Sequence, residues 1–172
     1  MKKEPKLIIL RGPSGSGKTT VARAVHEEQR NNGNLMAWIE QDYFRRIVLK
    51  EKDLSGGFYI QFIRDMVLYL LKNGHDVILE GIFVADRCEE MFKEIIESHP
   101  AENFFFYFDI SLKETIRRHN TKSNKDAFGE KELKAWYRDK DFLICIKEKI
   151  IQENEKAEDI AERIKLISGL KS

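Results

Sequence analysis

Residues 7–20 read LIILRGPSGSGKTT, and this stretch decides the fold predicted for the chain. Residues 7–10 form a short apolar run that the Gly12-Pro13 pair ends, which is typical of a buried strand followed by a turn. Helix-forming residues then continue over residues 18–31, where the sequence Asn-Asn-Gly-Asn marks the helix end. The stretch therefore predicts a strand, a glycine-rich loop and a helix in immediate succession.

The loop carries the complete pattern GxxxxGK[ST] over residues 12–19. Its glycines allow backbone N–H groups to turn inward around phosphate oxygens, and the following helix adds its free N–H groups and positive end. Lys18 can reach the β- and γ-phosphates of a nucleoside triphosphate, and the Thr19 hydroxyl is placed to ligate Mg²⁺. A dinucleotide site is disfavoured because Thr20 occupies the third glycine position of GxGxxG. The residues predicted to bind the nucleotide are Gly12, Ser14, Gly15, Ser16, Gly17, Lys18, Thr19 and Thr20.

Apolar runs along the rest of the chain alternate with segments of helical periodicity. Such runs predict strands at residues 35–40, 77–79 and 104–108, and a fifth strand within the ambiguous run 146–151. Two capping boxes are expected to open helices, namely Asp86 with Glu89 and Ser111 with Glu114. Strands that are apolar on both faces and alternate with helices indicate an α/β fold, in which helices cover both faces of a parallel sheet. Ligands bind beyond the carboxyl ends of the strands in such sheets.

The composition suits a single soluble domain over residues 1–172. The chain is 42% hydrophobic and 34% charged, with a formal net charge of +1. This balance argues against a dedicated nucleic-acid or membrane binder. The apolar run at residues 7–10 is too short for a signal peptide or a membrane span, and two cysteines are too few for a disulfide framework. We therefore expect a cytoplasmic protein, with Cys88 buried on an apolar helical stripe.

Charged residues follow two of the predicted strands. Asp42 follows the second strand, where its carboxylate could accept a proton from a substrate hydroxyl, and Arg45 could hold an anionic group. The alternative is that Asp42 only caps the next helix and Arg45 pairs with it at the surface. Glu80 follows the third strand, where it could orient Mg²⁺ through water, help Asp42 position the acceptor, or simply accept backbone hydrogen bonds. We therefore predict Asp42, Arg45 and Glu80 as substrate-binding residues and Thr19 and Glu80 as metal-binding residues.

Residues 113–125 carry five Lys or Arg against one Glu. A cationic helix that leads into a polar loop suits a lid over phosphates at about 113–129, although a solvated helix face is the usual origin of such a run. Adjacent arginines cannot face the same way on a helix, and of Arg117 and Arg118 we expect Arg118 to be catalytic. His119 is predicted to be a surface residue rather than a base, and Trp136 and Tyr137 could be core residues.

Taken together, these motifs resemble the small P-loop kinases, in particular adenylylsulfate, shikimate and gluconate kinases, chloramphenicol phosphotransferase and the zeta toxins. The resemblance rests on the loop at residues 12–19, Asp42-x-x-Arg45, Glu80-Gly81 and the basic segment. It implies a three-layer fold with a five-stranded parallel sheet in the order 2-3-1-4-5. It also implies that ATP and Mg²⁺ bind at the loop, and that Asp42 and Lys18 are catalytic. The glycine pair and substrate arginine of the shikimate kinases have no counterpart, which leaves the acceptor open.

The leading hypothesis is an ATP-dependent kinase that transfers the γ-phosphoryl group to a hydroxyl or phosphate of a small molecule. The alternative is a nucleotide-dependent regulatory NTPase that acts on a protein partner and uses water as the acceptor. A kinase of nucleic-acid ends would need a basic groove, which the balanced charge disfavours.

Overall fold

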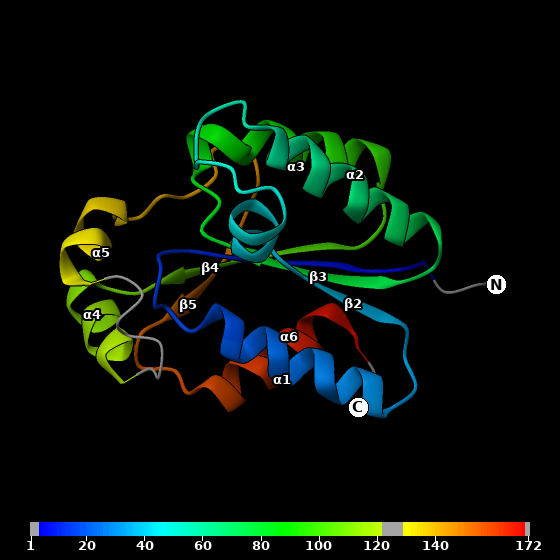
Figure 1. The fold of residues 1–172 in the computed structure, drawn as a ribbon. Helices are drawn as coiled ribbons and strands as arrows, with labels where there is room; N and C mark the ends of the chain where they lie inside the picture. The colour runs from blue at the N-terminus through cyan, green and yellow to red at the C-terminus, as the bar shows by residue number, and fades with distance from the viewer. Residues whose placement is uncertain (1–3, 122–128, 171–172) are drawn as a thin grey trace.

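The computed structural model describes residues 4–121 and 129–170 (Figure 1). Five parallel strands form one sheet in the order β2-β3-β1-β4-β5, so the predicted strand order is confirmed. The strands are β1 (Leu7–Arg11), β2 (Met36–Glu40), β3 (Asp76–Gly81), β4 (Asn103–Asp109) and β5 (Lys149–Gln152). The first strand therefore lies at the centre of the sheet, with neighbours on both sides.

Helices cover both faces of this sheet. Figure 1 shows α2 (Phe58–Lys72) and α3 (Ala85–Ser98) on one face, with α1 (Lys18–Asn31) and α6 (Ala157–Ser168) on the other. The side chains of β1 enter the two cores in turn. Leu7 and Ile9 pack in the core beneath α2 and α3, whereas Ile8 and Leu10 pack against α1 and α6. Because both faces are covered, the strand reads as an uninterrupted apolar run.

The remaining helices lie beyond the carboxyl ends of the strands, where the predicted site residues gather. A short π-helix, η1 (Tyr43–Val48), follows β2 directly. Figure 1 shows α4 (Leu112–Asn120) and α5 (Glu130–Trp136) side by side at this end of the sheet. The strand register sets Glu80 on β3 opposite Leu10 on β1 and Glu40 on β2. The loop after β1 therefore lies beside the acidic ends of its neighbours.

One of the two predicted helix caps needs correction. The helix α3 begins at Ala85, one residue before Asp86, and the predicted capping box is absent from it. Instead, the carboxylate of Asp141 accepts the hydrogen bond of the Ala85 N–H group at 2.9 Å. A residue distant in sequence thus supplies the cap, which local spacing does not reveal. The other predicted cap is present, since the Ser111 hydroxyl accepts from the Glu114 N–H group at 3.3 Å.

The fifth strand lies at the edge of the sheet and begins later than the apolar run suggests. It contains four residues, and its exposed ends carry Lys149 and Gln152. Arg163 of α6 donates a hydrogen bond to the carbonyl oxygen of Ile150 at 2.8 Å.

As expected, Cys88 is buried in the core. In the two described ranges, no helix is long and apolar enough to cross a membrane.

Candidate active site

The loop between β1 and α1 has a backbone that requires glycine. Gly12, Gly15 and Gly17 have φ values of +141°, +79° and +104°, a region that side chains disfavour. Two of these positions are also closely approached by other parts of the chain. A Cβ atom on Gly12 would lie 2.7 Å from the carbonyl oxygen of Phe108, and one on Gly15 would lie 2.9 Å from that of Thr115. The positive φ values require glycine at all three positions, and at Gly12 and Gly15 there is also no room for a side chain.

Lys18 is the first residue of α1, and its ammonium group lies within the loop. Its Nζ atom donates to the carbonyl oxygens of Gly12 at 2.9 Å and Pro13 at 2.8 Å, and to the Ser16 hydroxyl at 3.2 Å. The side chain is buried although it is charged. The positive charge thus stands at the N-terminal end of α1, where free N–H groups and the helix dipole also favour an anion.

The two predicted metal-binding residues are in direct contact. The Thr19 hydroxyl donates to the carboxylate of Glu80 at 2.7 Å. Burial raises the pKa of Glu80 above its usual value, against the opposing effects of Lys18 and Thr19, and burial also raises the pKa of the neighbouring Glu40. Hydroxyl and carboxylate oxygens are ligands that Mg²⁺ prefers, and this ion normally keeps several waters and substrate phosphates in its shell. The donor set at Thr19 and Glu80 therefore fits Mg²⁺.

The adjacent arginines of α4 have different surroundings. Arg118 donates to the carbonyl oxygen of Ser16 at 2.8 Å, to that of Glu153 at 2.8 Å and to the Glu114 carboxylate at 2.7 Å. Among the described residues, the side chain of Arg117 forms hydrogen bonds with Glu114 only, and 68% of it is exposed. Hydrogen bonds from Arg117 and Arg118 lower the pKa of Glu114 to about 2. The structure therefore brings Arg118 to the loop and leaves Arg117 at the surface.

The rest of the cationic segment differs partly from expectation. Lys122 and Lys125, with the other residues of the predicted lid at 122–128, lie outside the described residues. His119 was predicted at the surface, but it is buried with 2% of its area exposed. The reason is its helical position, because it follows the buried Thr115 by four residues and shares the inner face of α4.

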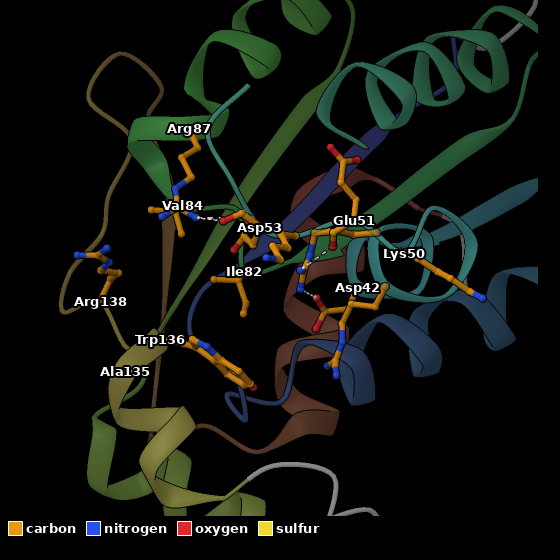
Figure 2. Close-up of a pocket in the computed structure, with 14 residues that line it drawn as sticks. Asp42, Lys50, Glu51, Asp53, Ile82, Val84, Arg87, Ala135, Trp136 and Arg138 are labelled. Carbon is orange, nitrogen blue, oxygen red and sulfur yellow. Dashed lines mark hydrogen bonds and ion pairs between the residues drawn. The ribbon is translucent and has the colours of Figure 1, made fainter. Parts of the chain in front are cut away.

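On the other side of the loop, Asp42 and Arg45 form an ion pair at 2.8 Å (Figure 2). Only 14% of the Arg45 side chain is exposed, whereas half of the Asp42 side chain is. Asp42 stands at the N-terminus of η1 but makes no capping hydrogen bond with its side chain. The pairing that formed the alternative interpretation is thus present, and both residues also line a cleft.

This cleft has a volume of about 600 Å³ and begins at Ser14 of the loop. Figure 2 shows side chains from four separate parts of the chain around it. They are Ser14, Asp42, Arg45, Arg46, Lys50, Glu51, Lys52, Asp53, Ile82, Val84, Arg87, Ala135, Trp136 and Arg138. The prediction that Trp136 is a core residue is wrong, because 41% of it is exposed and it lines the cleft. It is the last residue of the seven-residue helix α5, and it faces the cleft rather than the core.

Sequence reasoning missed Arg11, which connects the loop strand to the walls of the cleft. Its side chain is fully buried and donates twice to the carbonyl oxygen of Phe83, at 3.1 and 2.8 Å. It also forms ion pairs of 2.9 Å with Asp141 and with Glu148, whose pKa is raised by burial. An arginine that ends an otherwise apolar strand was the signal available in the sequence, because a buried cation needs acidic partners.

Gln41 makes a second connection that the sequence did not reveal. Its side-chain oxygen accepts from the N–H groups of Ile82 at 3.0 Å and Phe83 at 3.4 Å, which joins the segments after β2 and β3. A Cβ atom on Gly81 would clash with this oxygen. The glycine that follows Glu80 therefore makes room for a structural contact between neighbouring segments.

Comparisons with known proteins agree with this architecture. The chain matches the AAA_33 family, described as AAA domain, over residues 7–141. It is 24% identical over 192 residues to a guanylate kinase of Caldanaerobacter subterraneus subsp. tengcongensis, covering 97% of this chain and 88% of that protein.

Solved structures of small-molecule kinases are similar over nearly the whole chain. The APS kinase CysC of Mycobacterium tuberculosis, in complex with AMPPNP and APS, has a TM-score of 0.71 at 17% identity. The match covers 98% of this chain and 99% of the APS kinase chain. A gluconokinase of Sinorhizobium meliloti 1021 has a TM-score of 0.64 at 14% identity, and the match covers 97% of this chain and 93% of the gluconokinase chain. The predicted resemblance to P-loop small-molecule kinases is therefore confirmed at the level of fold.

Proposed function

The chain belongs to the AAA_33 family, and from this premise we propose that it is an ATP-dependent kinase acting on a small molecule. The γ-phosphoryl group of ATP is transferred to a hydroxyl or phosphate of the acceptor. One observation carries the proposal: Ser14 belongs both to the phosphate-binding loop and to the lining of a cleft of about 600 Å³. A donor and an acceptor bound in these two places would meet at that residue, as transfer requires.

The donor side would neutralise the triphosphate. Gly12 and residues 14–20 carry backbone N–H groups, and Lys18 and Arg118 bring positive charge to the same loop. Thr19 and Glu80 would hold Mg²⁺, which would supply further neutralisation of the phosphate charge. Phosphoryl transfer passes through a loose transition state, so positioning and charge neutralisation supply most of the acceleration.

The cleft would provide the base that takes the proton from the substrate hydroxyl. The acceptor oxygen forms a bond to the γ-phosphorus while the bond from that phosphorus to the β–γ bridging oxygen breaks. The hydroxyl proton passes to the carboxylate of Asp42, which Arg45 orients through their 2.8 Å ion pair. An acceptor phosphate is already ionised and needs no such base.

A screen for γ-phosphoryl transfer tests the proposal. Hydroxylated metabolites, aminocyclitol and phenicol antibiotics, and nucleotides would be incubated with ATP and Mg²⁺, and products identified by mass spectrometry. We expect one class to gain a phosphate, and Lys18→Ala to abolish the gain. With a hydroxyl acceptor at saturation, Asp42→Asn should lower kcat about 10²-fold, while Asp65→Asn on the exposed face of α2 leaves it unchanged. Unchanged transfer by Lys18→Ala would refute the assignment.

A regulatory NTPase is the second candidate, and one observation favours it. Exposed apolar side chains gather next to the cleft on η1 and at the start of α2, namely Tyr43, Ile47, Val48 and Phe58. A protein partner could cover such a surface. In the same screen this candidate predicts phosphate release to water and no phosphorylated small molecule.

A further inference from the structure

The cleft beside the loop has an unbalanced set of charges. Its lining includes six Lys or Arg side chains and three Asp or Glu side chains, an excess of three positive charges. The whole chain has a formal net charge of only +1. Positive charge is therefore concentrated at this cleft and offset elsewhere on the molecule.

The three carboxylates of the cleft are already engaged. Asp42 pairs with Arg45 at 2.8 Å, and Asp53 pairs with Arg87 at 3.3 Å. Glu51 accepts hydrogen bonds of 2.7 and 2.9 Å from the first backbone N–H groups of α2. None of these carboxylates is available to neutralise the other cations.

Four cations of the lining remain, namely Arg46, Lys50, Lys52 and Arg138. In residues 4–121 and 129–170, no carboxylate lies within ion-pair distance of any of them. All four are exposed, and Figure 2 shows that Lys50 extends outward at the edge of the cleft. These cations share the lining of one concave surface, with Lys50 and Arg138 at opposite ends of it (Figure 2). Like charges that share such a surface repel one another, and a bound anion relieves that repulsion.

The rest of the lining is apolar and suits the body of a small organic molecule. Ile82, Val84, Ala135 and Trp136 contribute to it. Figure 2 shows the indole of Trp136 next to the side chain of Ile82, facing the side of the cleft that holds Asp42. A half-exposed aromatic ring beside cationic groups can pack against a flat or apolar skeleton whose charged end points the other way.

We infer that the acceptor is a small anion, whose phosphate or carboxylate group is bound among the unpaired cations that line the cleft, Arg46, Lys52 and Arg138, while its carbon skeleton packs against Trp136. The inference rests on the proposed function, since it names the substrate class of the same site. Lys50 contributes less because it extends outward. Neutral sugars and cationic aminocyclitols are expected to bind poorly.

Matched pairs of compounds test the inference without any requirement for activity. The pairs are AMP with adenosine, GMP with guanosine and gluconate with glucose, which differ in the anionic group. The chain has two tryptophans, so in a Trp38→Phe background the fluorescence of Trp136 reports on the cleft. We expect the charged member of at least one pair to bind at least 10-fold more tightly than its neutral partner. Equal affinities, or no binding of the charged members at millimolar concentration, would overturn the inference.

Variants locate the anion. Combining Arg46→Gln with Arg138→Gln should remove the preference for the charged member, whereas Lys134→Gln on the exposed face of α5, outside the cleft lining, should retain it. Thermal unfolding confirms that each variant is folded. If the anion were held by the phosphate-binding loop instead, Lys18→Ala would remove the preference and the double variant would not, which also overturns the inference.

The same titrations separate the inference from the proposed function. A protein that prefers the charged members but transfers no phosphate from ATP to any of them would refute the proposed function and leave the anion site in place. A protein that phosphorylates the neutral members as efficiently as the charged ones would keep the kinase assignment and refute the anionic acceptor.

Discussion

The two halves of the candidate site are built in different ways. The phosphate-binding half comes from one contiguous stretch, residues 12–20, and depends mainly on backbone shape, since Gly12 and Gly15 have positive φ values and close neighbours. The cleft comes from four separate parts of the chain and depends on side chains. A loop that binds through its backbone recognises phosphates, which all nucleoside triphosphates share. A cleft lined by side chains can recognise different molecules in proteins of the same fold.

The largest effect is expected at Arg11, the residue that joins the two halves. Arg11→Met leaves Asp141 and the buried Glu148 without their cation, and we expect the free energy of unfolding to fall by about 3–5 kcal/mol. Denaturant unfolding measures the change. Arg64→Met is the control, because it breaks exposed ion pairs and should cost less than about 1 kcal/mol. Similar losses in both variants would mean that Arg11 does not connect the halves.

The two arginines of α4 provide the next test, which sharpens the description of the phosphate-binding half. Arg118→Ala removes the contact with Ser16 and should lower kcat about 10²-fold. Arg117→Ala removes only an exposed contact with Glu114 and should change kcat less than about two-fold. Steady-state kinetics at saturating ATP distinguish them, and equal effects would contradict the placement of Arg118.

Two glycine substitutions compare the effect of a steric contact in the loop with the effect of a positive φ alone. Gly15 and Gly74 have φ values of +79° and +83°, so alanine should strain both by about 1 kcal/mol. Only at Gly15 does the new methyl group meet another atom, the carbonyl oxygen of Thr115 at 2.9 Å. We expect Gly15→Ala to weaken ATP binding about 10-fold or more and Gly74→Ala to leave it unchanged, as calorimetric titration would show. Unchanged binding in both variants would contradict a loop shaped by contact.

The smallest effect is expected from Glu80→Gln, which separates stability from function. Burial raises the pKa of Glu80, so the folded state binds this proton more readily than the unfolded chain. The ionised group therefore lowers stability as the pH rises from about 4.5 through the raised pKa. At pH 7, Glu80→Gln should raise Tm by about 2 °C and flatten the pH dependence of Tm. The variant should also need more Mg²⁺ for activity, and a lower Tm together with unchanged Mg²⁺ dependence would contradict this role.

The features that could be predicted from the sequence are those set by neighbouring residues, and the features that could not are those set by contacts between distant residues. The strands and the glycine-rich loop could be predicted because apolar runs and glycine spacing are local signals, whereas the strand order was predicted from the resemblance to the small P-loop kinases. Trp136 and His119 were misplaced because the burial of a helix face depends on what packs against it. The cap of α3 and the cations of the cleft depend on contacts between distant residues, which no local pattern contains. That residues 1–172 form one domain with a lid near 113–129 stays a prediction.

The short edge strand β5 has a consequence for behaviour at high concentration. The free edge of a sheet can pair with a strand from another molecule, which leads to aggregation. Here the edge offers only four residues, it carries Lys149, and Arg163 already occupies the carbonyl group of Ile150. A foreign strand would have to displace that guanidinium group and bring its own backbone past a lysine. The edge is thereby protected against intermolecular β-pairing, and Arg163→Ala is the substitution most suited to expose it.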